Sequence, residues 1–168
     1  MTDTAAKPVQ SDVARVMLRH TLATLAYRGG KAVRNAPASF AHFKACATCR
    51  TPVQILAHIG DLVDWALSIA QGAQKWNDST PLPWDEEVSR FYRSLQKLDD
   101  FLAGAEALQV RGEKLFQGPI ADALTHVGQL SMLRRLAGAQ IRSENYFRAE
   151  IVAGRVGPEQ AQPGREFD

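Results

Sequence analysis

Apolar residues recur at every third or fourth position along four long segments of the chain, and no segment alternates convincingly with a period of two. Spacings of three and four place apolar side chains on one face of an α-helix, whereas a half-buried strand needs strict alternation. The pattern therefore predicts an all-α protein with helices at about 11–34, 52–71, 84–102 and 120–139.

Residues that start and stop helices support these boundaries. Thr51 followed by Pro52 is a strong start signal, because threonine caps free N–H groups and proline fits the first helical position. Ser11 is a second candidate N-cap. Pro37 closes the first helix because proline lacks an N–H, and Gly138 closes the last because glycine suits helix C-termini.

The inward face expected for the first helix contains a histidine. We expect His20 there as a hydrogen-bonded core residue, and His42 near the surface in the connection to the second helix. The rest of this predicted stripe consists of Val13, Val16, Met17, Thr24 and Tyr27.

Four amphipathic helices of similar length predict a four-helix bundle, because each apolar stripe must be buried against another helix. The connection from Gln74 to Pro83 holds about ten residues, long for a hairpin, so we expect a crossover between parallel second and third helices. The predicted organisation is a disordered segment at 1–10, the bundle at 11–152 and an extended or loosely ordered tail at 153–168.

Length and charge narrow the function classes. A chain of 168 residues buries its own core without disulfides or metals, so a metal here would serve chemistry rather than the fold. A net charge of +2 without a basic run argues against dedicated nucleic-acid binding. The first ten residues lack the apolar stretch of a signal peptide, and no apolar run approaches the ~20 residues that span a bilayer. We therefore expect a cytoplasmic protein without membrane contact.

The only two cysteines, Cys46 and Cys49, have the spacing of a redox pair or of half a zinc site. No second pair completes a zinc knuckle, and no predicted strand precedes the motif as in a thioredoxin-like protein. We therefore expect two ordinary thiols in a loop or at the start of a helix, in a reducing compartment.

Two histidines stand near the middle of the inward face of a predicted helix, His58 in the second and His126 in the fourth. Asp122 precedes His126 by one helical turn, so their side chains emerge from the same face. Burying a carboxylate near a bundle axis is costly unless a cation compensates it. A divalent metal held by His58, Asp122 and His126 supplies that cation, and two imidazoles with one carboxylate are typical of catalytic metal sites. A metal-free ion pair between Asp122 and His126 fits the same spacing.

Other polar residues lie close enough in sequence to support such a site. Gln129 and Asp61 each stand three residues beyond a histidine of the triad, where either can hydrogen bond to an imidazole. Asp61 fits a solvated helix face equally well. Arg134 and Arg135 follow two turns beyond His126, and we expect one of them to hold an anionic substrate group while the other faces water.

Two stretches carry a resemblance to a known family. They are Arg50-Thr51-Pro52-Val53-Gln54-Ile55-Leu56-Ala57-His58 and Ala123-Leu124-Thr125-His126-Val127-Gly128-Gln129-Leu130. The chain resembles the DinB-like (YfiT-like) metalloenzymes from about Ser11 to Ala139. In that family the first stretch places a histidine on the second helix, and the second places a metal-binding histidine before a Gly-Gln-Leu sequence. The family usually has another histidine four residues earlier, where this chain has Asp122.

The resemblance implies an up-down-down-up bundle, often dimeric, with an open site for nickel, zinc or iron. Characterised members include thiol-dependent S-transferases and an isomerase that use low-molecular-weight thiols. It therefore implies a divalent-metal-dependent transferase, or a hydrolase, that acts on a small molecule as a homodimer. The alternative is a non-catalytic bundle, metal-stabilised or metal-free, that serves as a binding or stress-related module.

Overall fold

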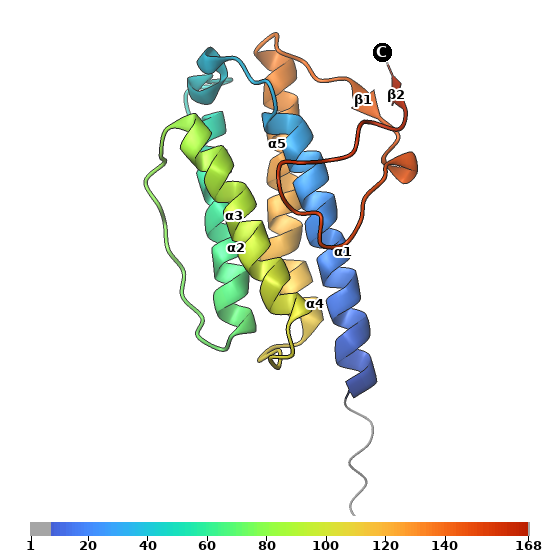
Figure 1. The fold of residues 1–168 in the computed structure, drawn as a ribbon. Coiled ribbons are helices and arrows are strands. Elements are labelled where there is room, and N and C mark those ends of the chain that lie inside the picture. Colours follow the sequence, from blue (N-terminus) through green and yellow to red (C-terminus); the bar gives the residue numbers. More distant parts are fainter. Residues whose placement is uncertain (1–7, 168) are drawn as a thin grey trace, which may run out of the picture.

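The computed structural model describes residues 8–167, and these form a mainly helical chain (Figure 1). The all-α prediction is confirmed. The long helices are α1 (Pro8–Val33), α2 (Pro52–Ala70), α3 (Trp84–Ala103) and α5 (Ala121–Leu136). Short elements connect and follow them: η1 (Ala38–His42), α4 (Gly112–Leu115), η2 (Phe116–Ile120), β1 (Ser143–Glu144), η3 (Tyr146–Arg148) and β2 (Glu166–Phe167). Most of the predicted N-terminal segment, residues 1–7, lies outside the described residues, and residues 8–10 already belong to α1.

α2 begins where its sequence predicts. Thr51 and Gln54 form a capping box, in which the Thr51 N–H donates to Gln54 Oε1 at 2.9 Å, and Pro52 takes the first helical position. The apolar residues of α2 turn inward as expected, since Ile55, Leu56, Ile59, Leu62 and Val63 are all buried. By length and composition α2 is apolar enough to cross a membrane, but here it contacts both α3 and α5, and this packing accounts for its apolar character.

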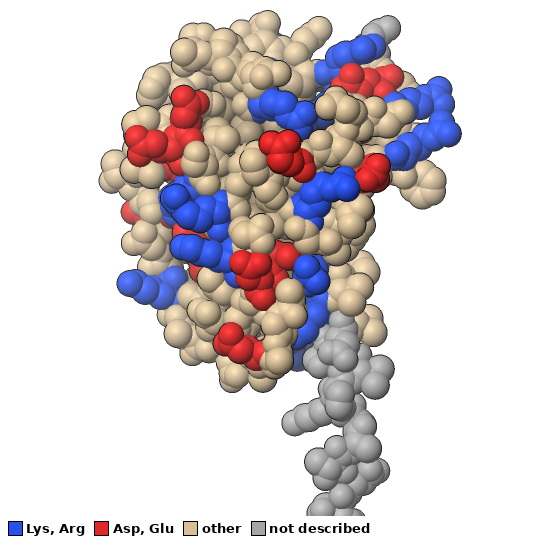
Figure 2. All heavy atoms as spheres, in the orientation of Figure 1, with Lys and Arg blue, Asp and Glu red and all other residues tan. Residues whose placement is uncertain are grey.

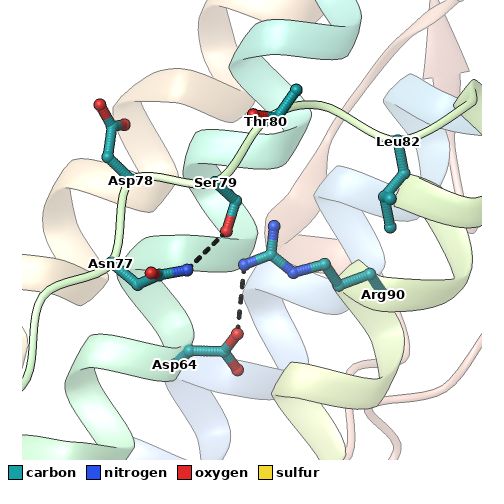
Figure 3. A pocket seen from close by; sticks show the side chains of 7 residues that line it. All are labelled: Asp64, Asn77, Asp78, Ser79, Thr80, Leu82 and Arg90. Carbon is teal, nitrogen blue, oxygen red and sulfur yellow. Dashed lines mark hydrogen bonds and ion pairs between the residues drawn. The ribbon is translucent and has the colours of Figure 1, made fainter.

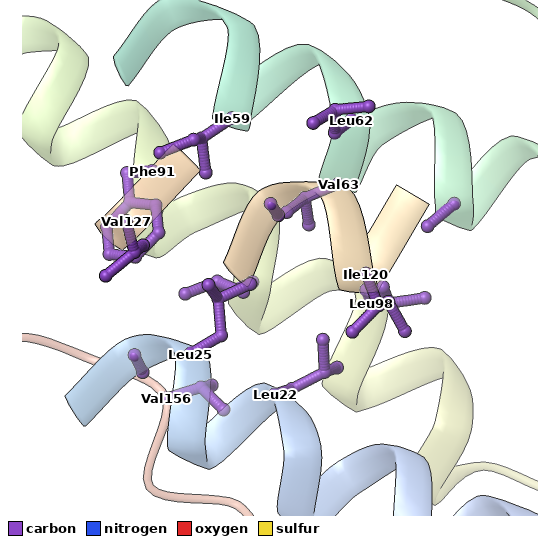
Figure 4. Close-up of a cluster of buried hydrophobic side chains, with 14 of the residues drawn as sticks. Leu22, Leu25, Ile59, Leu62, Val63, Phe91, Leu98, Ile120, Val127 and Val156 are labelled. Carbon is purple, nitrogen blue, oxygen red and sulfur yellow. The ribbon is translucent and has the colours of Figure 1, made fainter. Parts of the chain in front are cut away.

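The core lies among the four long helices. α2 packs against α3 and α5, and α1 packs against the same two helices from the other side. Buried side chains from all four meet between them, as Figure 4 shows for Leu22, Leu25, Ile59, Leu98 and Val127. The segment between α2 and α3 runs along the outside of the packed helices from one end to the other (Figure 1). Basic and acidic side chains are interspersed on the face seen in Figure 2.

The predicted inward stripe of α1 is wrong over its first half. Val13, Val16 and Met17 are 61%, 65% and 60% exposed, and His20 is exposed rather than a core residue. The buried face consists instead of Leu18, Leu22, Ala23, Leu25, Ala26 and Tyr27. The reason is that α1 carries two apolar stripes, and the one rich in leucine and alanine packs into the core.

The C-terminal tail is extended, but it is packed against the helices. Val156 is completely buried in the main core. β1 and β2 pair antiparallel, and Lys31 Nζ lies 2.7 Å from both Glu144 Oε2 and Glu166 Oε1. Tyr27 donates its hydroxyl to Glu144 Oε1 at 2.7 Å. Of the two expectations for this segment, the structure shows the extended one, with the tail packed against the helices.

Cys46 and Cys49 form a disulfide in the loop between η1 and α2. The turn brings their Cα atoms within 5.1 Å, a separation that a disulfide spans. The expectation of two free thiols is therefore wrong. His42 is exposed at the end of η1, as expected.

Candidate metal centre

The three predicted ligands meet between two neighbouring helices. His58 lies near the middle of α2, and Asp122 and His126 lie one turn apart on α5. One donor atom from each residue falls within 4.8 Å of the other two, so the three residues can hold a metal ion. The structure therefore brings together the triad that the sequence predicts.

The spacing of these donor atoms fits a shared cation better than a direct ion pair. Asp122 Oδ1 lies 3.5 Å from His126 Nε2, and Asp122 Oδ2 lies 3.9 Å from His58 Nε2. Both distances exceed a normal charge-assisted hydrogen bond. Donors bound tetrahedrally to one zinc-like ion lie about 3.4 Å apart. The donor set, two imidazoles and a carboxylate, also suits a transition metal.

Gln129 fixes the orientation of the His126 ring. Its Oε1 lies 2.7 Å from His126 Nδ1, and an amide oxygen only accepts hydrogen bonds. The proton of a neutral His126 therefore belongs on Nδ1, which leaves the lone pair of Nε2 facing Asp122. Metal-binding histidines are commonly held in this way by a partner of the other ring nitrogen.

His58 is enclosed by aromatic rings. The Trp76 ring lies 5.7 Å from it edge-to-face, Trp65 lies 5.6 Å from Trp76, and the His126 ring lies 4.8 Å from His58. Burial lowers the pKa of His58, and the neighbouring His126 and Arg50 lower that pKa further. His58 is therefore neutral at pH 7, the state in which an imidazole binds a metal.

Asp122 stands where α5 begins. Gly118 has non-helical backbone angles, and Pro119 follows it, so the chain kinks at η2 before α5 starts at Ala121. Asp122 thus lies in the first helical turn, where the helix dipole favours a carboxylate. Its side chain is 49% exposed, so the triad is open to solvent on this side.

Two cavities adjoin the triad. One of about 220 Å³ includes His58 in its lining, together with Arg50, Gln54, Asp61, Asp78, Ser79 and Pro81. The other, of about 450 Å³, includes Asp122 in its lining, together with Leu62, Trp65, Gln117, Gly118, Ala121 and Thr125. The triad is thus reachable from a polar pocket and from a more apolar one.

Asp61 is engaged with an arginine rather than with an imidazole. Arg90 bonds to Asp61 Oδ1 and, at 3.2 Å, to Asp64 Oδ2. The other Asp61 oxygen accepts the Ser79 N–H at 3.0 Å. Figure 3 shows the Arg90–Asp64 pair beside the connection that carries Asp78 and Ser79. Asp61 therefore anchors this connection next to the site.

Arg134 and Arg135 lie in the last turn of α5 and bond to groups near its C-terminus. Arg134 is buried and donates to Ala139 O at 2.7 Å and to Arg34 O at 3.3 Å, and its guanidinium lies over Phe40. Arg135 donates to Ser143 Oγ at 2.6 Å. The two carbonyls that Arg134 contacts lie at helix C-termini, which attract cations. The structure does not bring either arginine to the triad.

Sequence reasoning missed two residues beside the triad. Arg50 lines the same cavity as His58, and Trp76 covers the His58 ring. Arg50 lies two residues before α2 begins at Pro52, so helical spacing alone does not place it beside His58. Nothing local marks Trp76, because its position depends on the path of the connection.

Comparison of the chain with protein-family models, curated proteins and solved structures gives no match.

Proposed function

We propose that this protein is a metal-dependent enzyme in which His58, Asp122 and His126 hold one divalent transition metal. The observation that carries the proposal is the convergence of three donor atoms from α2 and α5 within 4.8 Å, at separations too long for direct hydrogen bonds. Nickel, zinc and iron all accept two imidazoles and one carboxylate.

The resemblance to the DinB-like metalloenzymes supports this proposal and refines it. We assign the helices to the up-down-down-up bundle of that family, with Asp122 in place of the usual second histidine. Aspartate is a hard, anionic ligand and makes the site more negative than a three-histidine site. The chemistry transferred by the resemblance is attack of a low-molecular-weight thiol on a small electrophile.

A bound divalent metal would lower the pKa of a thiol that reaches it, so that thiolate forms near neutral pH. The chain's own residues have separate roles around that chemistry. Gln129 keeps the His126 proton on Nδ1. Trp76 packs edge-to-face against His58, and Trp65 packs in the same way against Trp76, so aromatic side chains form one side of the site. The Trp65 indole N–H is buried and has no hydrogen-bond partner in the described part of the chain, which leaves it free to donate to a substrate.

A structural metal site is the competing function, and the geometry favours it less. A structural site is usually closed by four protein ligands. Within residues 8–167 the ligand group holds three residues, and no described His, Cys, Asp or Glu joins it as a fourth. Half of Asp122 is exposed beside a cavity of about 450 Å³, as substrate access requires.

The first test is the metal content of untagged protein purified without added metal. We expect about one transition-metal ion per chain, retained in the control His20→Ala and lost in His126→Ala. Both variants remove one imidazole, but only the second removes a triad donor. Elemental analysis by mass spectrometry provides the measurement.

Two results would contradict the proposal. Wild-type protein that contains no metal and takes up neither nickel nor zinc would leave a helical bundle without metal chemistry. Metal that stays bound in His126→Ala would place the site elsewhere.

A further inference from the structure

Two side chains of opposite charge line the cavity beside His58 without taking part in the ion pairs that hold the fold together. Arg50 and Asp78 both line it, Arg50 just before α2 and Asp78 on the α2–α3 connection. Neither side chain forms a hydrogen bond or ion pair with another described residue. In contrast, the third charged residue of the lining, Asp61, is fully engaged by Arg90 and by the Ser79 N–H.

The wall that carries Asp78 is held in place. Asn77 Nδ2 donates to Ser79 Oγ at 2.8 Å, and the Ser79 N–H donates to Asp61 at 3.0 Å, so the residues on both sides of Asp78 are fixed. In Figure 3 the Asp78 side chain points away from Arg90. Arg90 therefore does not neutralise it.

The opposite wall follows one side of α2. Gln54 and His58 lie one turn apart on α2, and Arg50, two residues before the helix begins, lines the same cavity. The three residues therefore form a row that leads from the start of the helix to the triad. Gln54 uses its oxygen to accept the Thr51 N–H, and its amide nitrogen donates to no described residue. Arg50 and Gln54 together therefore offer unused donors suited to a carboxylate.

These charges select the class of ligand. Asp78 would repel a simple anion, and Arg50 would repel a simple cation, so one wall of the cavity disfavours each of them. A zwitterion satisfies both. The volume of about 220 Å³ is below the usual range for drug-sized ligands, so the group that enters is small.

We propose that this cavity binds the α-amino-acid end of a thiol substrate, with its carboxylate on Arg50 and Gln54 and its ammonium on Asp78. The thiol then points along the row toward His58. This inference rests on the proposed metal-dependent thiol chemistry for its purpose, but the binding of the amino-acid end does not itself require the metal.

The experiment compares three thiols that differ only in their charged groups: L-cysteine, 3-mercaptopropionate without the ammonium, and cysteamine without the carboxylate. Each is titrated into the metal-free protein and followed by amide and Arg side-chain NMR shifts. We expect L-cysteine to bind about tenfold more tightly than either truncated thiol, because each loses one charge-assisted contact. Shifts should centre on Arg50, Gln54 and Asp78.

Two variants assign the charges. Arg50→Gln should weaken L-cysteine and 3-mercaptopropionate binding about tenfold and leave cysteamine binding unchanged. Asp78→Asn should weaken L-cysteine and cysteamine binding about tenfold and leave 3-mercaptopropionate binding unchanged. Arg93→Gln, which removes an exposed arginine of α3 that does not line the cavity, is the matched control and should change nothing. Equal affinity for the three thiols, or no shift at these residues, would overturn the inference.

A second titration uses protein loaded with Co²⁺ and follows the thiolate–metal absorption band. Selective L-cysteine binding to the metal-free protein without such a band would sustain the amino-acid pocket and contradict the thiol chemistry at the triad. A band of equal strength and midpoint for all three thiols would sustain the metal–thiol chemistry and overturn the pocket.

Discussion

Two polar clusters lie about one turn apart on α2, and they differ in how their groups are bonded. In the first, Arg90 joins Asp61, Asp64 and the completely buried Glu87, whose Oε1 also accepts the Leu82 N–H at 2.8 Å. In the second, His58, Asp122 and His126 face one another at 3.5 Å and more. The first contains its own counterion, and the second does not.

The difference separates a structural role from a functional one. Charges buried with their partners hold α2, α3 and the connecting segment together, and a ligand has little to add there. Polar atoms that converge without bonding are stabilised when a cation arrives. Incomplete bonding, rather than the presence of charge, therefore marks the candidate site.

The largest effect is expected from breaking the bonded cluster. Arg90→Met keeps most of the aliphatic packing but leaves Asp61 and Glu87 buried without their cation. Removing one partner of a buried ion pair costs about 3–5 kcal/mol, so we expect a loss of this size in the free energy of unfolding, measured by urea denaturation.

The control for this variant is Arg93→Met, one turn along the same helix on an exposed position. It should change the free energy of unfolding by less than about 0.5 kcal/mol. Similar losses in both variants would mean that the Arg90 cluster is no more structural than an ordinary surface charge.

An intermediate effect is expected at the second cluster. Gln129→Leu removes the acceptor of the His126 Nδ1–H and should weaken metal binding about 10–100-fold, because the ring loses its fixed orientation. The protein is titrated with Zn²⁺ against a chromophoric chelator. Since Gln129 is exposed, unfolding of the metal-free protein should be nearly unaffected. Unchanged zinc affinity would show that the hydrogen bond does not serve the metal.

The smallest effect is expected at the edge of the bonded cluster. Asp64 is partly exposed and shares Arg90 with the buried Asp61. Asp64→Asn should therefore lower the free energy of unfolding by no more than about 1 kcal/mol, the usual range of exposed ion pairs. If Asp64→Asn lowered the free energy of unfolding as much as Arg90→Met in the same urea measurement, Asp64 rather than Asp61 would be the main counterion of Arg90.

The buried side chains of a helix were predictable where all of its large apolar residues turn toward the core. No large apolar residue of α2 is among the exposed ones, and the capping signal at Thr51 appears in the structure. α1 has two apolar sides, and periodicity alone cannot choose between Met17 and Leu18 as the core residue. That choice depends on which side complements α3 and α5, which is a property of the whole helical core.

The site was predictable to the extent that its residues are local. Asp122, His126 and Gln129 share one helical face, and their spacing alone places them together. His58 needed the packing of α2 against α5. The prediction that an arginine reaches the site was wrong for Arg134, because its guanidinium bonds to carbonyls at helix C-termini. Trp76 was missed because it lies on a connection without periodicity.

The segment between α2 and α3 also divides the chain into two parts. Residues 71–78 are all exposed, and a single proteolytic cut there would yield one fragment with α1 and α2 and another with α3 and α5. His58 would belong to the first fragment, and Asp122 and His126 to the second. A metal ion bound by all three would then act as a cross-link between two separate polypeptides, and the affinity of the fragments for each other would rise with the metal concentration.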